Sequence, residues 1–342
     1  MTIRTIRILQ TSEYSRKILS GNEHGIVHSV YRKTINLQFN GQLLALQSKD
    51  SPLSPISLIT ELTEDEMETL ALTSGMPVTI LHSCNTPYCI PAKSRTAADA
   101  AVPAIHIQLK QNLILSLETA EFSDLLLSCS LSEESLQNIE KLCLETLRLR
   151  STGSFELLFT AREKAMDILF LKAADLRLTA AETALKNQNW QKAADSLCGL
   201  IGLGLGLTPG GDDFLCGVLA GLILCGISPF QLYNSQPCTD SLLHLPLTAH
   251  PFTCVLTTQL QNHLCNTNDI SAAFLHCALK GQFSLAVNLL PKLKTSYEIL
   301  SVFSEIGHSS GTDTLCGIYF ILKNRLLCDI IYVILQTKQI LF

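Results

Sequence analysis

Apolar and polar residues alternate along the first third of the chain, and this alternation predicts β-strands. The pattern is clearest on either side of Asn40-Gly41, from Ile35 to Phe39 and from Gln42 to Leu46. Asparagine and glycine both tolerate a positive φ, so the dipeptide predicts a tight hairpin between two strands.

More of this strand-rich region follows the hairpin. Thr63 and Glu66 have the spacing of a capping box, which predicts the start of a short helix. Residues 77–83 and 104–118 alternate again and predict further strands. Between them, the segment 84–103 is rich in Pro, Ala and Ser and is expected to be a loop.

The pattern changes to helical spacing from about residue 120. The pattern from Ser154 to Lys186 has few helix breakers and predicts a long helix. A last apolar helix is predicted from Gly311. Strands followed by helices favour an α+β fold. We expect an N-terminal, mostly antiparallel β lobe over residues 1–118 and a larger, all-helical lobe over residues 119–342.

Composition and charge narrow the classes of function. Hydrophobic residues make up 47% of the 342 residues and charged residues 16%, which suits a globular chain that forms an oligomer. The net charge of −5 and the absence of a long basic run argue against a nucleic-acid partner. No apolar run reaches the roughly 20 residues that a membrane span needs. The thirteen cysteines read as small buried residues, and the N-terminus lacks an apolar signal core. A cytoplasmic protein is therefore expected.

The stretch "GLGLTPGGDDFLCG", from Gly204 to Gly217, interrupts two apolar runs with glycines and paired aspartates. Thr208 is suited to cap a helix, and Pro209 suits the first helical position. Gly210 and Gly211 would then leave the amides of the first turn uncovered. Free amides and the helix dipole together attract phosphate or carboxylate, so this stretch predicts a small-anion site.

A second stretch, "GHSSGTDTLCG", lies one hundred positions further along, from Gly307 to Gly317. It also places a Gly/Ser-rich turn before an apolar helix. Ser309, Ser310 and Thr312 add hydroxyl groups, and Gly311 matches Gly211. We interpret the pair as an internal duplication or as two turns with the same task. The task we expect is to bring two helix N-termini to one pocket.

Other interpretations of these residues stay open. The glycines would also allow two backbones to pack closely, and an aspartate in a first turn is favoured by the dipole without any function. Asp212, Asp213 and Asp313 are themselves anions. They would orient the loops, accept an N–H from a ligand, or hold a cation such as Mg²⁺. His308 is a candidate proton donor, and an equally good structural hydrogen-bonding residue.

Three segments in order, "GLTPGGDDFLCG", "DISAAFLHCALKGQF" and "IGHSSGTDTLCGI", resemble the AllH family. The segment "VHSVYRKTINLQFNGQLLALQ" resembles the opening of that family, which includes an arginine and an asparagine, here Arg32 and Asn36. The resemblance covers roughly residues 24–325. It implies a subunit of oxamate carbamoyltransferase, an enzyme of anaerobic allantoin breakdown and so of purine catabolism. The family's enzyme exchanges a carbamoyl group between oxalurate and phosphate, giving oxamate and carbamoyl phosphate, and it needs FdrA-like and AllG-like subunits.

These observations give one leading hypothesis and two alternatives. In the leading one the chain is a carbamoyltransferase subunit without a metal or other cofactor, and His308, Asp213 and Asp313 are catalytic. The expected substrate-binding residues are Thr208, Gly210, Gly211, Asp212, Ser309, Ser310, Gly311, Thr312, Arg32 and Asn36. Arg32 would clamp a carboxylate, although a lone arginine on a strand is also a common surface residue. The alternatives are a non-catalytic assembly subunit and a metal-dependent hydrolase that uses Asp212, Asp213, His308 and Asp313.

Overall fold

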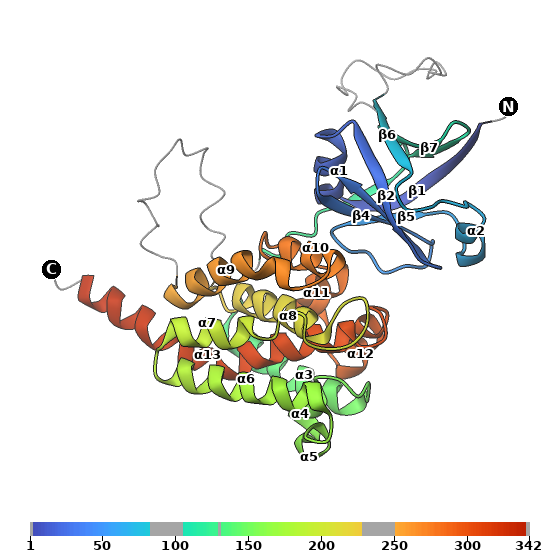
Figure 1. The fold of residues 1–342 in the computed structure, drawn as a ribbon. Helices are drawn as coiled ribbons and strands as arrows, with labels where there is room; N and C mark the ends of the chain where they lie inside the picture. The colour runs from blue at the N-terminus through green and yellow to red at the C-terminus, as the bar shows by residue number, and fades with distance from the viewer. Residues whose placement is uncertain (1–2, 83–104, 129–130, 228–249, 340–342) are drawn as a thin grey trace. The chain divides into compact units, whose positions relative to one another are not determined.

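The computed structural model describes residues 3–82, 105–128, 131–227 and 250–339 (Figure 1). The chain divides into two compact units, Met1–Leu125 and Leu126–Phe342, which we call the β unit and the helical unit. A strand-rich first unit and a helical second unit confirm the predicted α+β class. The loop predicted at residues 84–103 lies outside the described residues.

The β unit is built on one barrel-like sheet. Among the described residues the strand order is β5-β4-β3-β2-β6-β7-β8-β1-β9, and β5 also pairs with β1, which closes the sheet on itself. Most neighbours are antiparallel, whereas β1 is parallel to β8 and β9, and β4 is parallel to β5. The strands are β1 Arg4–Ser12, β2 His24–Val30, β3 Thr34–Phe39, β4 Gln42–Gln47, β5 Ser57–Thr60, β6 Pro77–His82, β7 Ile105–Lys110, β8 Leu113–Ser116 and β9 Glu121–Ser123.

Local sequence signals in the β unit are confirmed. Asn40 and Gly41 have φ of 47° and 77° and join β3 to β4. Thr63 and Glu66 form the predicted capping box of α2, Glu64–Glu68. The pattern analysis missed β1, in which Ile6 and Ile8 are buried between charged and polar residues, and the following helix α1, Glu13–Ser20.

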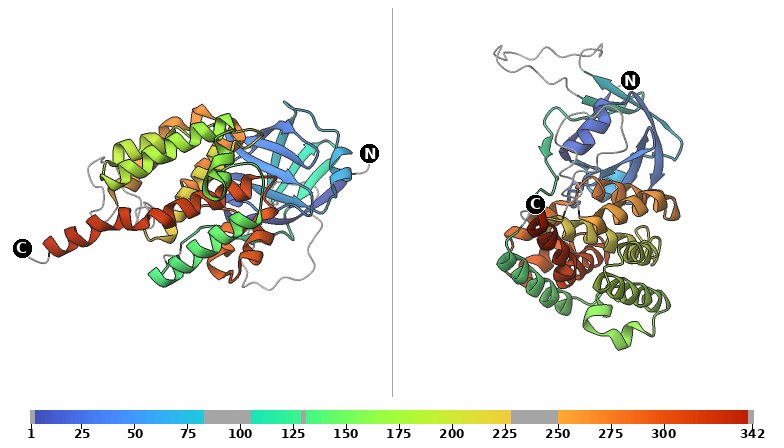
Figure 2. Two further views of the ribbon diagram at one scale, coloured as in Figure 1. Left: turned by 90° about the horizontal axis from the view of Figure 1, so that it is seen from below. Right: turned by 90° about the vertical axis from the view of Figure 1, so that its left-hand side faces the viewer.

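The helical unit surrounds one large apolar core. Its α-helices are α3 Glu133–Leu149, α4 Leu157–Thr160, α5 Arg162–Ala165, α6 Leu169–Lys186, α7 Trp190–Cys198, α8 Gly210–Leu224, α9 Pro251–His263, α10 Asp269–Ala278, α11 Leu285–Leu289, α12 Ser296–Ser304 and α13 Ser310–Gln339. Two short 3₁₀ turns, η2 Leu264–Asn266 and η3 Leu290–Lys292, follow α9 and α11. The long C-terminal helix α13 contacts α8, α3, α12 and α6 (Figure 2).

The single helix predicted from Ser154 to Lys186 is wrong, because the segment forms α4, α5 and α6. Ala161 interrupts it with φ −153° and ψ 60°. At its start, the buried Glu156 carboxylate accepts the amides of Thr152 and Gly153, each at 2.7 Å. These bonds fix a turn before α4, and a pattern search based on local spacing does not detect them.

The closest packing in the helical unit is between α8 and α13. A Cβ atom added to Gly217 would lie 1.9 Å from the Thr314 carbonyl oxygen, and one added to Gly317 would lie 1.9 Å from the Phe214 carbonyl oxygen. The two helices therefore approach backbone to backbone, and each contributes the glycine that the other requires. α8 is buried over almost its whole length, as expected of a helix that is apolar on all sides.

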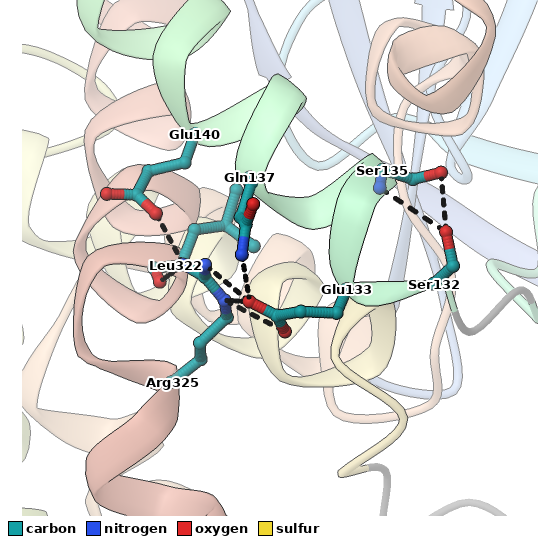
Figure 3. A network of polar contacts seen from close by, with 7 residues as sticks. All are labelled: Ser132, Glu133, Ser135, Gln137, Glu140, Leu322 and Arg325. Atoms are coloured by element: carbon teal, nitrogen blue, oxygen red, sulfur yellow. Dashed lines mark hydrogen bonds and ion pairs between the residues drawn. The ribbon is translucent and has the colours of Figure 1, made fainter.

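A buried arginine fastens α3 to α13 (Figure 3). Arg325 is 6% exposed, and its guanidinium lies 2.8 Å from Glu133 and also bonds Glu140 and the Leu322 carbonyl. Glu133 in turn accepts a bond from Gln137 at 3.0 Å. Because a buried cation without its partners is costly, this network fixes where the N-terminal part of α3 lies on α13.

We expect Gly217→Ala to destabilise the protein by about 3 kcal/mol or more, because the added methyl group would overlap a backbone carbonyl that cannot rotate away. Urea unfolding followed by circular dichroism measures the change. Gly199→Ala is the matched control, since the added Cβ would meet only the flexible Arg177 side chain. Equal stability of the two variants would contradict the backbone-to-backbone packing.

Candidate functional site

The starts of α8 and α13 meet through two hydroxyl groups. Thr208 Oγ1 lies 2.8 Å from Ser310 Oγ, and both residues are half-buried. The capping role predicted for Thr208 is wrong. Pro209 is the N-cap of α8, and the amides of Asp212 and Asp213 bond to its carbonyl oxygen. The side chain of Thr208 is thereby free to reach the other helix. The two Gly-rich turns do converge, as the sequence predicted.

Gly211 and Gly311 do not present free amides, so that part of the anion-site prediction is wrong. The Gly211 amide donates to the Leu203 carbonyl at 2.8 Å, and the Gly311 amide donates to the Ile306 carbonyl at 3.0 Å. A Cβ at either glycine would lie 2.0 Å from a carbonyl oxygen. Close packing explains both glycines, and their assignment as substrate-binding residues stays a prediction.

Other amides at the two helix starts are still available. In the part of the chain that the structure describes, the backbone N–H groups of Gly210, Ser310 and Thr312 have no acceptor. A Cβ at Gly204 would lie 2.6 Å from the Gly210 nitrogen, so a side chain there would cover this amide. Such donors at helix N-termini suit an oxyanion.

Asp313 is fully buried and lies against the start of α8. Its Oδ1 accepts the Phe155 amide and its Oδ2 accepts the Ser154 hydroxyl, each at 3.0 Å. A Cβ at Gly210 would lie 2.9 Å from Oδ2, so glycine is what allows this carboxylate to come so close to α8. Burial raises the pKa of Asp313 to about 7, although the bonds from Ser154 and Phe155 act in the opposite direction.

Asp213 is 9% exposed and faces the start of α13. The hydroxyls of Ser310 and Thr208 act to lower its pKa, while its buried Oδ2 has no hydrogen-bond partner among the described residues. Burial, followed by repulsion from Asp313, raises the pKa of Asp213 well above the usual range. Each aspartate therefore belongs to one helix and lies against the start of the other.

Two family models match this chain. The AllH family N-terminal domain matches residues 6–99, and a model described as oxamate carbamoyltransferase subunit AllH matches residues 200–322, which include both Gly-rich turns. The chain belongs to the AllH family. A search of curated proteins and a search of solved structures each found no match. Within the described residues, no helix of this AllH-family chain is long and apolar enough to cross a membrane.

Among the remaining predicted residues of the turns, Asp212 and Ser309 have partners within the chain. Asp212 Oδ1 accepts the Gly202 amide at 2.9 Å and its Oδ2 accepts the Thr267 hydroxyl at 2.5 Å, so Asp212 orients the glycine loop before α8. The Ser309 carbonyl accepts the Asp313 amide at 2.8 Å, and Thr312 is buried. The His308 side chain is exposed beside them.

Arg32 and Asn36 belong to the β unit of the AllH-family chain and interact with other residues there. The Arg32 guanidinium lies between 3.5 and 4.0 Å from the carboxylates of Glu64, Asp65 and Glu68. Asn36 is buried and donates to Ser29 Oγ at 2.9 Å. Their role in substrate binding stays a prediction.

Sequence reasoning missed three residues around the turns. Ser154 and Phe155 hold Asp313, and Arg150 donates to the His308 carbonyl at 2.9 Å. These contacts join residues more than 150 positions apart, and no local motif indicates them. For the metal-dependent alternative, no group of three or more His, Cys, Asp or Glu side chains that could hold a metal ion occurs in residues 3–82, 105–128, 131–227 and 250–339.

The raised pKa values predict how stability depends on pH. Between the ordinary aspartate pKa of about 4 and the folded value of about 7 for Asp313, the folded state holds protons that the unfolded chain releases. Asp313 therefore contributes stability that is complete below pH 4 and is lost as pH rises toward 7, and the raised pKa of Asp213 acts in the same direction. Each retained proton corresponds to about 1.4 kcal/mol per pH unit.

Asp213→Asn should accordingly lose less stability than the wild type when pH rises from 4.5 to 7. Urea unfolding at a series of pH values measures the difference, and Asp195→Asn, at an exposed site, is the control. A pH profile of Asp213→Asn parallel to that of the wild type would show that Asp213 does not retain a proton.

Proposed function

We propose that this chain is the AllH-type subunit of an oxamate carbamoyltransferase-like enzyme, and that it binds a small anion where α8 and α13 begin. The family description supports the reaction class. The converging helix starts support the site, because carbamoyl phosphate, oxamate and oxalurate are all small anions. The setting would be allantoin degradation, and the partners would be FdrA-like and AllG-like subunits.

The observation that carries this proposal is the unpartnered Oδ2 of Asp213, whose carboxyl group is influenced by the Thr208 and Ser310 hydroxyls. Buried polar atoms are nearly always hydrogen-bonded, so an exception needs an explanation. If Asp213 is protonated, Oδ2 is a donor that lacks an acceptor. If it is ionised, Oδ2 is an acceptor that lacks a donor. A carbamoyl group has both a carbonyl oxygen and an NH₂ group and satisfies either state.

The surrounding donors suit the chemistry of carbamoyl transfer. Negative charge develops on the carbonyl oxygen as the nucleophile adds, and fixed N–H and O–H donors stabilise it. The amides of Gly210, Ser310 and Thr312 are such donors, and within the Thr208–Ser310 hydroxyl pair the hydroxyl that accepts from the other keeps its own proton to donate. The Asp213 carboxyl group, whose pKa burial raises, adds one more in its protonated form. We assign the exposed His308 to proton exchange at the edge of this site.

A second function, that of an assembly subunit, is favoured by the loop before α8. Leu205 is 83% exposed and Leu207 is 53% exposed. The loop that carries them is held by Asp212 and by Asn268, which donates to the Leu207 carbonyl at 2.9 Å. Fixed apolar side chains in solvent are typical of a protein contact. A partner bound here would lie next to Thr208 and would help to complete the site.

Isothermal titration with carbamoyl phosphate tests anion binding. We expect Thr208→Val and Ser310→Ala each to weaken binding by roughly 10-fold or more, because each breaks the hydroxyl pair that would donate to a charged ligand. Ser301→Ala, at an exposed position of α12, should bind like the wild type. No binding by the wild type, alone or with its partner subunits, would count against the proposal.

The assembly role has a separate test. The double variant Leu205→Ser, Leu207→Ser should lose roughly 10-fold or more in affinity for the FdrA-like and AllG-like subunits, because two exposed apolar anchors are removed. Co-purification and analytical size exclusion measure this, and carbamoyl phosphate titration checks that the anion site is intact. The matched control is Leu176→Ser, an exposed leucine on α6. If the complex forms normally with the double variant, this loop is not the contact.

A further inference from the structure

Arg150 follows the last residue of α3 and reaches the turn that leads into α13. One terminal nitrogen donates to the Ser304 hydroxyl, and the other donates to the His308 carbonyl at 2.9 Å. Its Nε is buried and has no acceptor among the described residues. A guanidinium has five N–H donors, so these two bonds leave three of them unassigned.

The charge of Arg150 is also unpaired. Within residues 3–82, 105–128, 131–227 and 250–325, no carboxylate lies within 4.0 Å of its guanidinium. Arg162 and Arg325 of the same unit each lie 2.8 Å from a carboxylate. A half-buried cation with two fixed anchors and no counter-ion is a binding group for an anion from outside the chain.

A small cavity connects Arg150 to the first turn of α13. It is lined by Arg150, Thr146, Ser304 and Thr312 together with apolar side chains of α3, α12 and α13. Thr312 is one of the residues whose amide has no acceptor. Because apolar walls strengthen the attraction between a guanidinium and an anion, this surrounding favours charge recognition.

We propose that Arg150 binds the carboxylate of an oxamate-like ligand at the start of α13. This inference rests on the proposed function and deepens it. It names the Arg150 guanidinium as the protein group that distinguishes an anionic substrate from a neutral amide. The aspartates of the site cannot attract an anion by charge, and Arg150 adds the missing positive charge. Its planar, fixed fork suits a planar carboxylate with a single negative charge.

The experiment is titration of the full chain, alone and with its partner subunits, with oxamate, oxamide and phosphate. Oxamide replaces the carboxylate of oxamate by a neutral amide of the same size. We expect the wild type to prefer oxamate to oxamide. Arg150→Met should weaken oxamate binding by roughly 10-fold or more and remove this preference, and Arg150→Lys should recover part of it through its charge.

Two further variants separate charge recognition from a structural role. Arg148→Met removes an exposed cation two residues earlier and should leave oxamate affinity unchanged. Ser304→Ala removes one anchor of Arg150 but keeps the guanidinium, so the preference for oxamate over oxamide should remain. Thermal melting of every variant identifies loss of folding. If Arg150→Met does not fold, the preference of Arg150→Lys and Ser304→Ala for oxamate over oxamide still tests the role of the Arg150 charge.

The outcomes are distinguishable. Unchanged preference for oxamate in Arg150→Met would overturn the assignment, and so would equal loss of preference in Ser304→Ala. Wild-type binding of phosphate but not of oxamate would overturn the carboxylate assignment and leave the proposed anion site standing. Binding of none of the anions, with or without the partner subunits, would overturn the proposed function itself.

Discussion

The backbone contact between α8 and α13 is the constraint on which the rest of the helical unit depends. Gly217 and Gly317 each lie where any larger residue would meet a carbonyl oxygen of the other helix. Since the two contacts are reciprocal, the helices have little freedom to slide or rotate. This fixed crossing brings Thr208 within 2.8 Å of Ser310. It also buries the first turns of both helices, which carry the aspartates.

Two buried aspartates in one small volume oppose folding, and the structure only partly compensates for them. Both carboxyl oxygens of Asp313 accept a hydrogen bond, from the Ser154 hydroxyl and the Phe155 amide, whereas Oδ2 of Asp213 has no donor among the described residues. A group that is costly to bury and only partly hydrogen-bonded is typical of a functional site. Because Gly210 has no side chain, the Asp313 carboxylate lies against the start of α8. The same close packing therefore buries the carboxylate and raises its pKa.

The features that the sequence predicted correctly depend mainly on residues that are close to one another in the chain. The Asn40-Gly41 hairpin, the capping box at Thr63 and the change from strands to helices all follow from residues near one another, and all are confirmed. The convergence of the two Gly-rich turns was also predicted, from their similarity. The partners of those turns were not, because Gly211 packs on the backbone of the irregular loop before α8 and Asp313 is held by the distant Ser154. The helix predicted from Ser154 is broken locally, by the Glu156 carboxylate that fixes the turn before α4 and by the conformation of Ala161.

Helix α3 links the proposed anion site to the core through both of its ends. Near its start, Glu133 and Glu140 hold Arg325, which lies further along α13 (Figure 3). Directly after its end, Arg150 holds the turn from which α13 begins. Because α3 is fastened to α13 at these two points, the Arg150 guanidinium has a fixed position relative to the first turn of that helix. A cation and amide donors that already have fixed positions stabilise developing charge more effectively than groups that must first be ordered.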